Sequence, residues 1–105
     1  MKTLVSVPHH EYPASVRTLV EDKLQSLLKF YDRIVSVRAV LARESERHKV
    51  ELVAHVGHGT TLVIEAHGEL FDTALEEALD RMGRVLQRHK TRLTERHRKG
   101  GRIGH

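Results

Sequence analysis

Cysteine and tryptophan are both absent from this 105-residue sequence, and its aromatic side chains are limited to two phenylalanines and two tyrosines. Without cysteine there is no disulfide, no zinc–thiolate site and no thiol nucleophile, and this usage fits a reducing cytoplasm. Long apolar runs are missing too. The first apolar run, at residues 4–7, contains a serine and is too short for a signal peptide or a membrane span. We therefore expect a cytoplasmic protein that does not enter a membrane.

Sequence motifs of catalysis are also missing. Neither a nucleophile elbow, nor a phosphate-binding loop, nor a pair of carboxylates in a recognisable context occurs. We therefore expect no enzymatic activity and no cofactor. The length suits one compact domain. Because Gly100 and Gly101 predict the end of the last helix, we assign residues 1–97 to this domain and residues 98–105 to a basic, mobile tail.

Positive charge is concentrated towards the end of the chain. The whole sequence has a formal net charge of +4, but residues 81–102 contain nine of its 18 Lys and Arg residues and only one of its 14 acidic residues, Glu95. Charge concentrated in this way is typical of a protein that binds a polyanion. The alternative is a basic helix end that merely faces solvent.

Apolar periodicity and turn residues predict six elements in the order β-α-β-β-β-α. The expected strands cover residues 3–7, 34–43, 50–56 and 60–68, and the expected helices cover residues 13–30 and 71–97. Polar residues 44–47 and the Gly-His-Gly at 57–59 predict turns. Because each strand has one apolar and one mixed face, we expect an α+β fold resembling a dsRBD. In it two helices pack on one face of a four-stranded sheet, whose first two strands run parallel.

Four arginines fall within one narrow stripe of the second predicted helix, at the edge of its apolar face. This arginine ridge consists of Arg81, Arg84, Arg88 and Arg92. On the same stripe only Glu77 and Glu95, at its ends, are expected to neutralise it. Guanidinium groups bind phosphate in a planar, bidentate way. With so few aromatic residues to stack on bases, the ridge predicts contacts to RNA phosphate and ribose.

Three segments together resemble the ribosome hibernation promoting factor and ribosome-associated inhibitor family, over about residues 3 to 97. They are Glu21-Asp22-Lys23-Leu24, Phe30-Tyr31-Asp32-Arg33-Ile34 and Asp80-Arg81-Met82-Gly83-Arg84-Val85-Leu86-Gln87-Arg88-His89-Lys90. The resemblance implies the same fold and a translation inhibitor that docks on rRNA of the small ribosomal subunit. The docking site would be the cleft between head and body, where tRNA and mRNA bind. Longer members carry a separate dimerisation domain, so this short form is expected to be monomeric off the ribosome.

The resemblance also assigns RNA-binding residues. Arg81, Arg84 and Arg88 match the family's basic residues on the second helix, and Lys23 and Lys29 match basic positions on the first. Lys90 and Arg92 complete the expected RNA-binding set. Departures from the family pattern leave the ridge unchanged. They are Ser26 in place of Lys, Tyr12 in place of a capping Thr, Leu70-Phe71-Asp72 in place of Asp-Met-Tyr, and Ala74-Leu75-Glu76 in place of Ala-Ile-Asp.

Two other functions use the open sheet face. His55 and His67, near Glu51 and Glu65, suggest a metal site, although no His-x-x-x-His helix motif and no cysteine supports it. The second alternative is a protein-interaction module, for which the sequence offers a modest apolar patch of Val40, Val53 and Val63.

Overall fold

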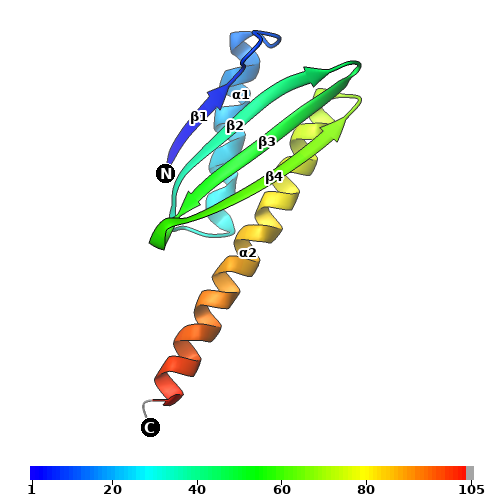
Figure 1. Ribbon diagram of the computed structural model, residues 1–105. Coiled ribbons are helices and arrows are strands. Elements are labelled where there is room, and N and C mark those ends of the chain that lie inside the picture. Colours follow the sequence, from blue (N-terminus) through cyan, green and yellow to red (C-terminus); the bar gives the residue numbers. More distant parts are fainter. Residues whose placement is uncertain (104–105) are drawn as a thin grey trace.

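The computed structural model describes residues 1–103, with the side chains of residues 1–57 and 59–95. Figure 1 shows the six main elements in the expected β-α-β-β-β-α order. The strands are β1 (Lys2–Ser6), β2 (Ile34–Glu44), β3 (Arg47–Val56) and β4 (Thr60–Gly68). The helices are α1 (Ala14–Leu24), its 3₁₀ continuation η1 (Gln25–Lys29), the short η2 (Gly57–Gly59) and α2 (Phe71–Ile103).

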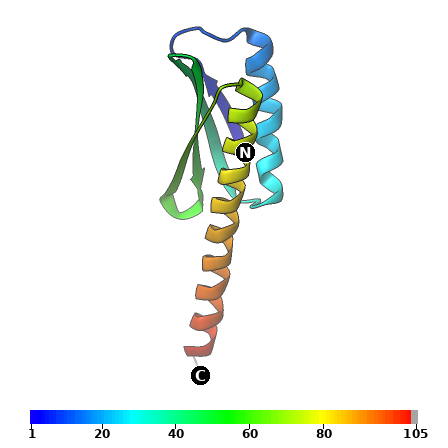
Figure 2. The ribbon, with the colours of Figure 1, turned by 90° about the vertical axis from the view of Figure 1, so that its right-hand side faces the viewer.

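The four strands form one sheet in the order β1-β2-β3-β4. β1 runs parallel to β2, with Leu4 opposite Arg38, and the other two pairs are antiparallel. Figures 1 and 2 show α1 and α2 on the same face of the sheet, so the other face is open. The α+β fold, the order of the elements along the chain, the parallel first pair and the position of both helices on one face (Figure 2) are therefore confirmed.

The core lies between the sheet and the two helices. Side chains point to alternate faces of a strand, and those that face the helices are buried, as Leu41 and Leu52 show. From the helices the largest buried side chains are Val20, Leu24, Leu27, Leu75, Met82 and Leu86. Burying one such side chain contributes roughly 1.5–3 kcal/mol relative to leaving it exposed. This layer fixes α2 against the sheet along its first half.

One glycine sets how closely α2 approaches the end of η1 within the helical layer. A Cβ atom at Gly83 would lie 2.6 Å from Cε2 of Phe30, much closer than two carbon atoms can pack. Only glycine therefore lets the Phe30 ring at the end of η1 rest directly on the α2 backbone. This packing fixes the spacing between η1 and α2.

The structure differs from the sequence predictions at three boundaries. The single helix expected for residues 13–30 is instead α1 followed by η1. The turn expected at residues 44–47 narrows to Ser45 and Glu46, because Ser45 adopts the left-handed conformation that a two-residue hairpin turn requires (φ 59°). Third, α2 continues past residue 97 to Ile103.

The extra length of α2 gives the molecule its elongated shape. The molecule measures 58 Å along its longest axis, and Figure 1 shows the second half of α2 extending beyond the sheet. Gly100 and Gly101 do not end the helix, since a glycine inside a helix costs about 1 kcal/mol but does not block it. The domain boundary at 97 and the mobility of the tail stay predictions, and residues 104–105 lie outside the described part of the chain.

Candidate nucleic-acid interface

The arginine ridge lies on the exposed side of α2. Arg81 leans back onto the sheet: its Nη1 donates to the backbone oxygen of Glu65 on β4 at 2.8 Å, and its Nη2 donates to Oε1 of Glu77. Arg84 donates to Oδ2 of Asp80 at 2.6 Å, and its side chain is 70% exposed. Met82 and Leu86 lie on the buried side of the same helix and alternate with the ridge arginines along the chain. Their packing in the core therefore fixes the positions of the arginines on the exposed side.

The acidic residues that pair with the ridge arginines are not all those that the sequence predicted. Asp80, which that expectation left out, pairs with Arg84 at the i, i+4 spacing, as Glu77 does with Arg81. Arg88 and Arg92 have no ion-pair partner among the described side chains. An exposed i, i+4 pair is worth only about 0.3–0.5 kcal/mol. Exchanging its carboxylate for a phosphate therefore costs little.

Two shallow grooves run along the outer half of α2. The larger, of about 610 Å³, is lined by Arg84, Gln87, Arg88, Thr91 and Arg92. Lys90 lines a second groove of about 320 Å³, together with Gln87, Thr91, Thr94 and Glu95. The structure therefore places Arg92 with the ridge, and it places Lys90 in a different groove from Arg88.

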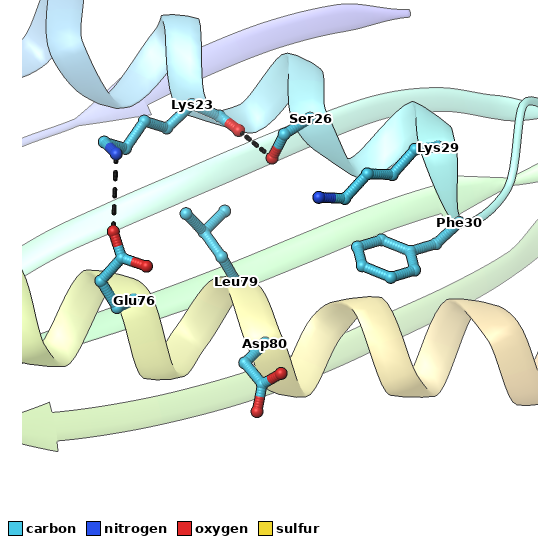
Figure 3. Close-up of a pocket in the computed structure, with 7 residues that line it drawn as sticks. All are labelled: Lys23, Ser26, Lys29, Phe30, Glu76, Leu79 and Asp80. Carbon is cyan, nitrogen blue, oxygen red and sulfur yellow. Dashed lines mark hydrogen bonds and ion pairs between the residues drawn. The ribbon is translucent and has the colours of Figure 1, made fainter.

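The two predicted lysines of the first helix lie across from α2, at a pocket of about 280 Å³ between the helices. This interhelical pocket is lined by Lys23, Ser26, Lys29, Phe30, Glu76, Leu79 and Asp80 (Figure 3). Nζ of Lys23 lies 3.5 Å from Oε1 of Glu76, and Nζ of Lys29 lies 5.1 Å from the centre of the Phe30 ring. Ser26 donates its hydroxyl hydrogen to the Lys23 carbonyl at 2.7 Å.

Asp80 connects the pocket to the ridge, because it lines the pocket and pairs with Arg84. The structure thus gathers Lys23, Lys29 and the ridge on the helical side of the molecule. Sequence reasoning missed the contributions of Phe30 and Asp80. One signal was present: Gly83 interrupts an otherwise apolar helical stripe, and such a glycine usually marks a close packing contact.

The open sheet face does not assemble the alternative metal site. His55 bonds to Thr61 Oγ1 at 3.0 Å, and His67 lies 3.2 Å from Glu65. His55 pairs with Thr61 across the ladder and His67 with Lys49. The two histidines are therefore roughly 20 Å apart at about 3.4 Å per residue. No group of three potential ligands occurs within the described residues.

The apolar patch on that face is small. Val63 and Leu4 are more than half exposed, Val53 is buried, and Arg38 lies in the same cross-strand row. Among the described helices, none is both long enough and apolar enough to cross a membrane.

An aromatic cluster that the sequence did not predict lies at the end of the sheet formed by the β2–β3 hairpin. Tyr12 Oη lies 2.6 Å from Nδ1 of His48 and donates to the Ala42 carbonyl at 3.2 Å, while Phe71 packs against both rings. Burial and the nearby Arg43 guanidinium lower the pKa of His48. This cluster joins the segment before α1 to the β2–β3 hairpin and to the start of α2, so its role is structural.

His89 lies on the inner side of α2 and is partly buried. The ring of His89 packs edge-on against the ring of Tyr31, which follows η1, with a centroid distance of 5.4 Å.

The protein is a small α+β domain in which two helices cover one face of a four-stranded sheet (Figure 2). Its helical side carries the basic residues of the ridge and of the interhelical pocket. A family model described as "Sigma 54 modulation protein / S30EA ribosomal protein" matches residues 4–94. The chain belongs to this family, and the resemblance to ribosome hibernation factors is confirmed.

Two curated relatives illustrate the similarity. The "Ribosome hibernation promoting factor" of Azotobacter vinelandii is 31% identical over 94 residues, which cover 88% of this chain and 87% of the relative. The protein of the same name from Escherichia coli K12 is 29% identical over 85 residues, which cover 81% of this chain and 88% of the relative.

Two solved structures share the fold. A ribosomal subunit interface protein from Coxiella burnetii superposes with a TM-score of 0.78 at 15% identity, covering 87% of this chain and 99% of that one. The N-terminal domain of Thermus thermophilus Protein Y gives a TM-score of 0.72 at 22% identity, covering 85% of this chain and 99% of that one.

Proposed function

We propose that this protein is a ribosome hibernation factor of the cytoplasm. It binds rRNA of the small ribosomal subunit in the cleft for tRNA and mRNA, and it inhibits translation by occupying that cleft, without catalysis. The observation that carries the proposal is the basic surface on one side of the molecule, formed by the ridge of α2 with Lys23 and Lys29 across the interhelical pocket. Family membership and the names of the relatives support the choice of the ribosome as partner.

The chemistry of the ridge suits phosphate rather than a base edge. Arg88 and Arg92 are exposed and unpaired among the described side chains, and Arg84 needs only to leave an exposed carboxylate. Arginines at successive turns lie about 5–6 Å apart, close to the spacing of phosphates along a nucleic-acid strand. Each contact releases counterions, so binding should weaken steeply as salt rises.

The test is co-sedimentation of the purified protein with isolated small and large subunits. We expect binding to small subunits, release at high salt, and competition with tRNA and mRNA for the cleft. A translation assay should show inhibition that depends on the ratio of protein to ribosomes and reaches a plateau. Binding to the large subunit alone, or no competition with tRNA and mRNA, would contradict the proposed site.

A further inference from the structure

We infer that the interhelical pocket is a binding site for one unpaired RNA base that carries an amino group, guanine being the best match. The inference rests on the proposed RNA binding and deepens it, because phosphate contacts along the ridge involve no base. The pocket is separate from the grooves of the ridge but adjoins them through Asp80 and Arg84. A base that leaves its strand next to the ridge would therefore reach the pocket.

The walls of the pocket carry complementary chemistry. In Figure 3 the Lys23–Glu76 pair closes one end, Leu79 points into the space between the helices, and Lys29 extends over the Phe30 ring at the other end. Among the described side chains, Lys29 has no carboxylate partner. The pocket thus joins an available ammonium, an apolar floor with an aromatic ring, and a carboxylate. A free phosphate would be repelled by Glu76 and Asp80, whereas a nucleotide can use all three features.

Size and geometry agree with a single base. The volume of about 280 Å³ is slightly smaller than the ~300 Å³ at which the range for drug-sized ligands begins, as expected for a ligand no larger than one base. The Phe30 ring is held against Gly83, so it forms a fixed stacking surface. An exposed cation–π contact, such as that of Lys29, is weaker than the stacking of a base on an aromatic ring. The flexible lysine can therefore leave the ring to the base and bind the adjoining phosphate.

The carboxylate selects the base. One oxygen of Glu76 contacts Lys23 at a long 3.5 Å, and the other has no partner among the described residues. Carboxylates accept hydrogen bonds from the amino groups of bases. Guanine presents an N–H and an amino group side by side and can engage both oxygens, whereas uracil has no amino group. The pocket should therefore prefer guanine to uracil.

The experiment titrates the free, isotopically labelled protein with GMP, UMP and inorganic phosphate while backbone NMR shifts are followed. We expect GMP at millimolar concentration to shift the amides of Lys29, Phe30 and Leu79, UMP to shift them less, and phosphate not to shift them. The charge-neutral double variant Lys29→Gln/Glu76→Gln should weaken GMP binding about tenfold, the loss of a charged hydrogen bond. Phe30→Leu should weaken it while the protein stays folded by thermal melting.

The matched control is Lys2→Gln/Glu69→Gln, which alters two exposed residues outside the pocket and leaves the net charge unchanged. It should bind GMP like the unaltered protein. Phosphate shifting the same amides as GMP would reduce the pocket to an anion patch and overturn the inference. So would equal effects of GMP and UMP, or an equal weakening in the control. A protein that co-sediments with small subunits but ignores GMP refutes this inference alone, whereas failure to co-sediment refutes the proposed function.

Discussion

Replacing three ridge arginines by alanine tests whether RNA binding depends on the position of these arginines or only on the net charge of the protein. The variant Arg81→Ala/Arg84→Ala/Arg88→Ala removes the guanidinium groups of three exposed residues. Removing one phosphate-binding arginine should weaken binding to the small subunit by ~1–2 kcal/mol. Because each such arginine contributes somewhat less than one unit to the log–log salt slope, the triple variant should lower the slope by up to ~2.7 units. The three replacements by glutamate should abolish binding altogether.

The structure predicts unequal single effects. Arg88 has no ion-pair partner in the described part of the chain, so Arg88→Ala should show the full effect of removing a phosphate-binding guanidinium. Arg84→Ala should cost less, since Arg84 must first leave Asp80. Arg81 also bonds the Glu65 carbonyl on β4, so Arg81→Ala should lower the free energy of unfolding as well, by about 1 kcal/mol.

The assay is equilibrium binding to labelled small subunits over a range of salt concentrations, with urea unfolding as the check on folding. The matched control replaces Arg38, Arg43 and Arg47 by alanine, three exposed residues of the sheet and hairpin with the same total charge. Arg47→Ala alone should also change little. The reasoning fails if the ridge variant binds with unaltered affinity at physiological salt, or if the control variant is weakened as much as the ridge variant.

Three further predictions concern the frame that holds the site. Gly83→Ala should lower the free energy of unfolding by about 1–3 kcal/mol in urea titration, because its new methyl group would overlap Phe30; an unchanged midpoint would contradict this packing. Met82→Ala should cost about 2–5 kcal/mol in the same assay, since Met82 is fully buried. The pKa of His48 is lowered in the folded state, so the unfolded chain binds the proton first and stability should fall as pH drops below about 6.5. His48→Gln should flatten this decline, and a decline of undiminished slope would assign it to other groups.

The fold could be predicted from the spacing of apolar residues, because the residues of the core recur at the period of each helix and strand. Leu52 and Ala54 on β3 and Leu75 on α2 fall on the buried face at the spacing that each element imposes. The end of α2 was not predictable in the same way. Gly100 lowers helix propensity, but propensity is a weak guide beside the rest of a long helix.

The residues of the candidate site could be predicted where they lie on one helix, but not where two helices bring them together. Arg84 and Arg88 share a stripe of α2 that helical geometry alone defines. Phe30 and Leu79 face one pocket only because η1 packs against α2, and their separation in sequence gives no sign of it. Asp80 was overlooked because only acidic residues on the stripe itself were counted as partners of the arginines, whereas Asp80 lies beside the stripe, one turn before Arg84.

The two sides of α2 have coupled roles. Met82 and Leu86 anchor the helix in the core, and Arg81, Arg84 and Arg88 alternate with them on the outer side. The packing of these turns in the core thus sets the spacing of the arginines. Because the backbone is already ordered, binding should cost little conformational entropy there. Among the described side chains from Gln87 to Glu95, none is fully buried, and only His89 and Leu93 are partly buried, so the turn that carries Arg92 is held less firmly. It follows that Arg81 to Arg88 should contribute most to placement, whereas Arg92 should contribute mainly long-range attraction that salt screens.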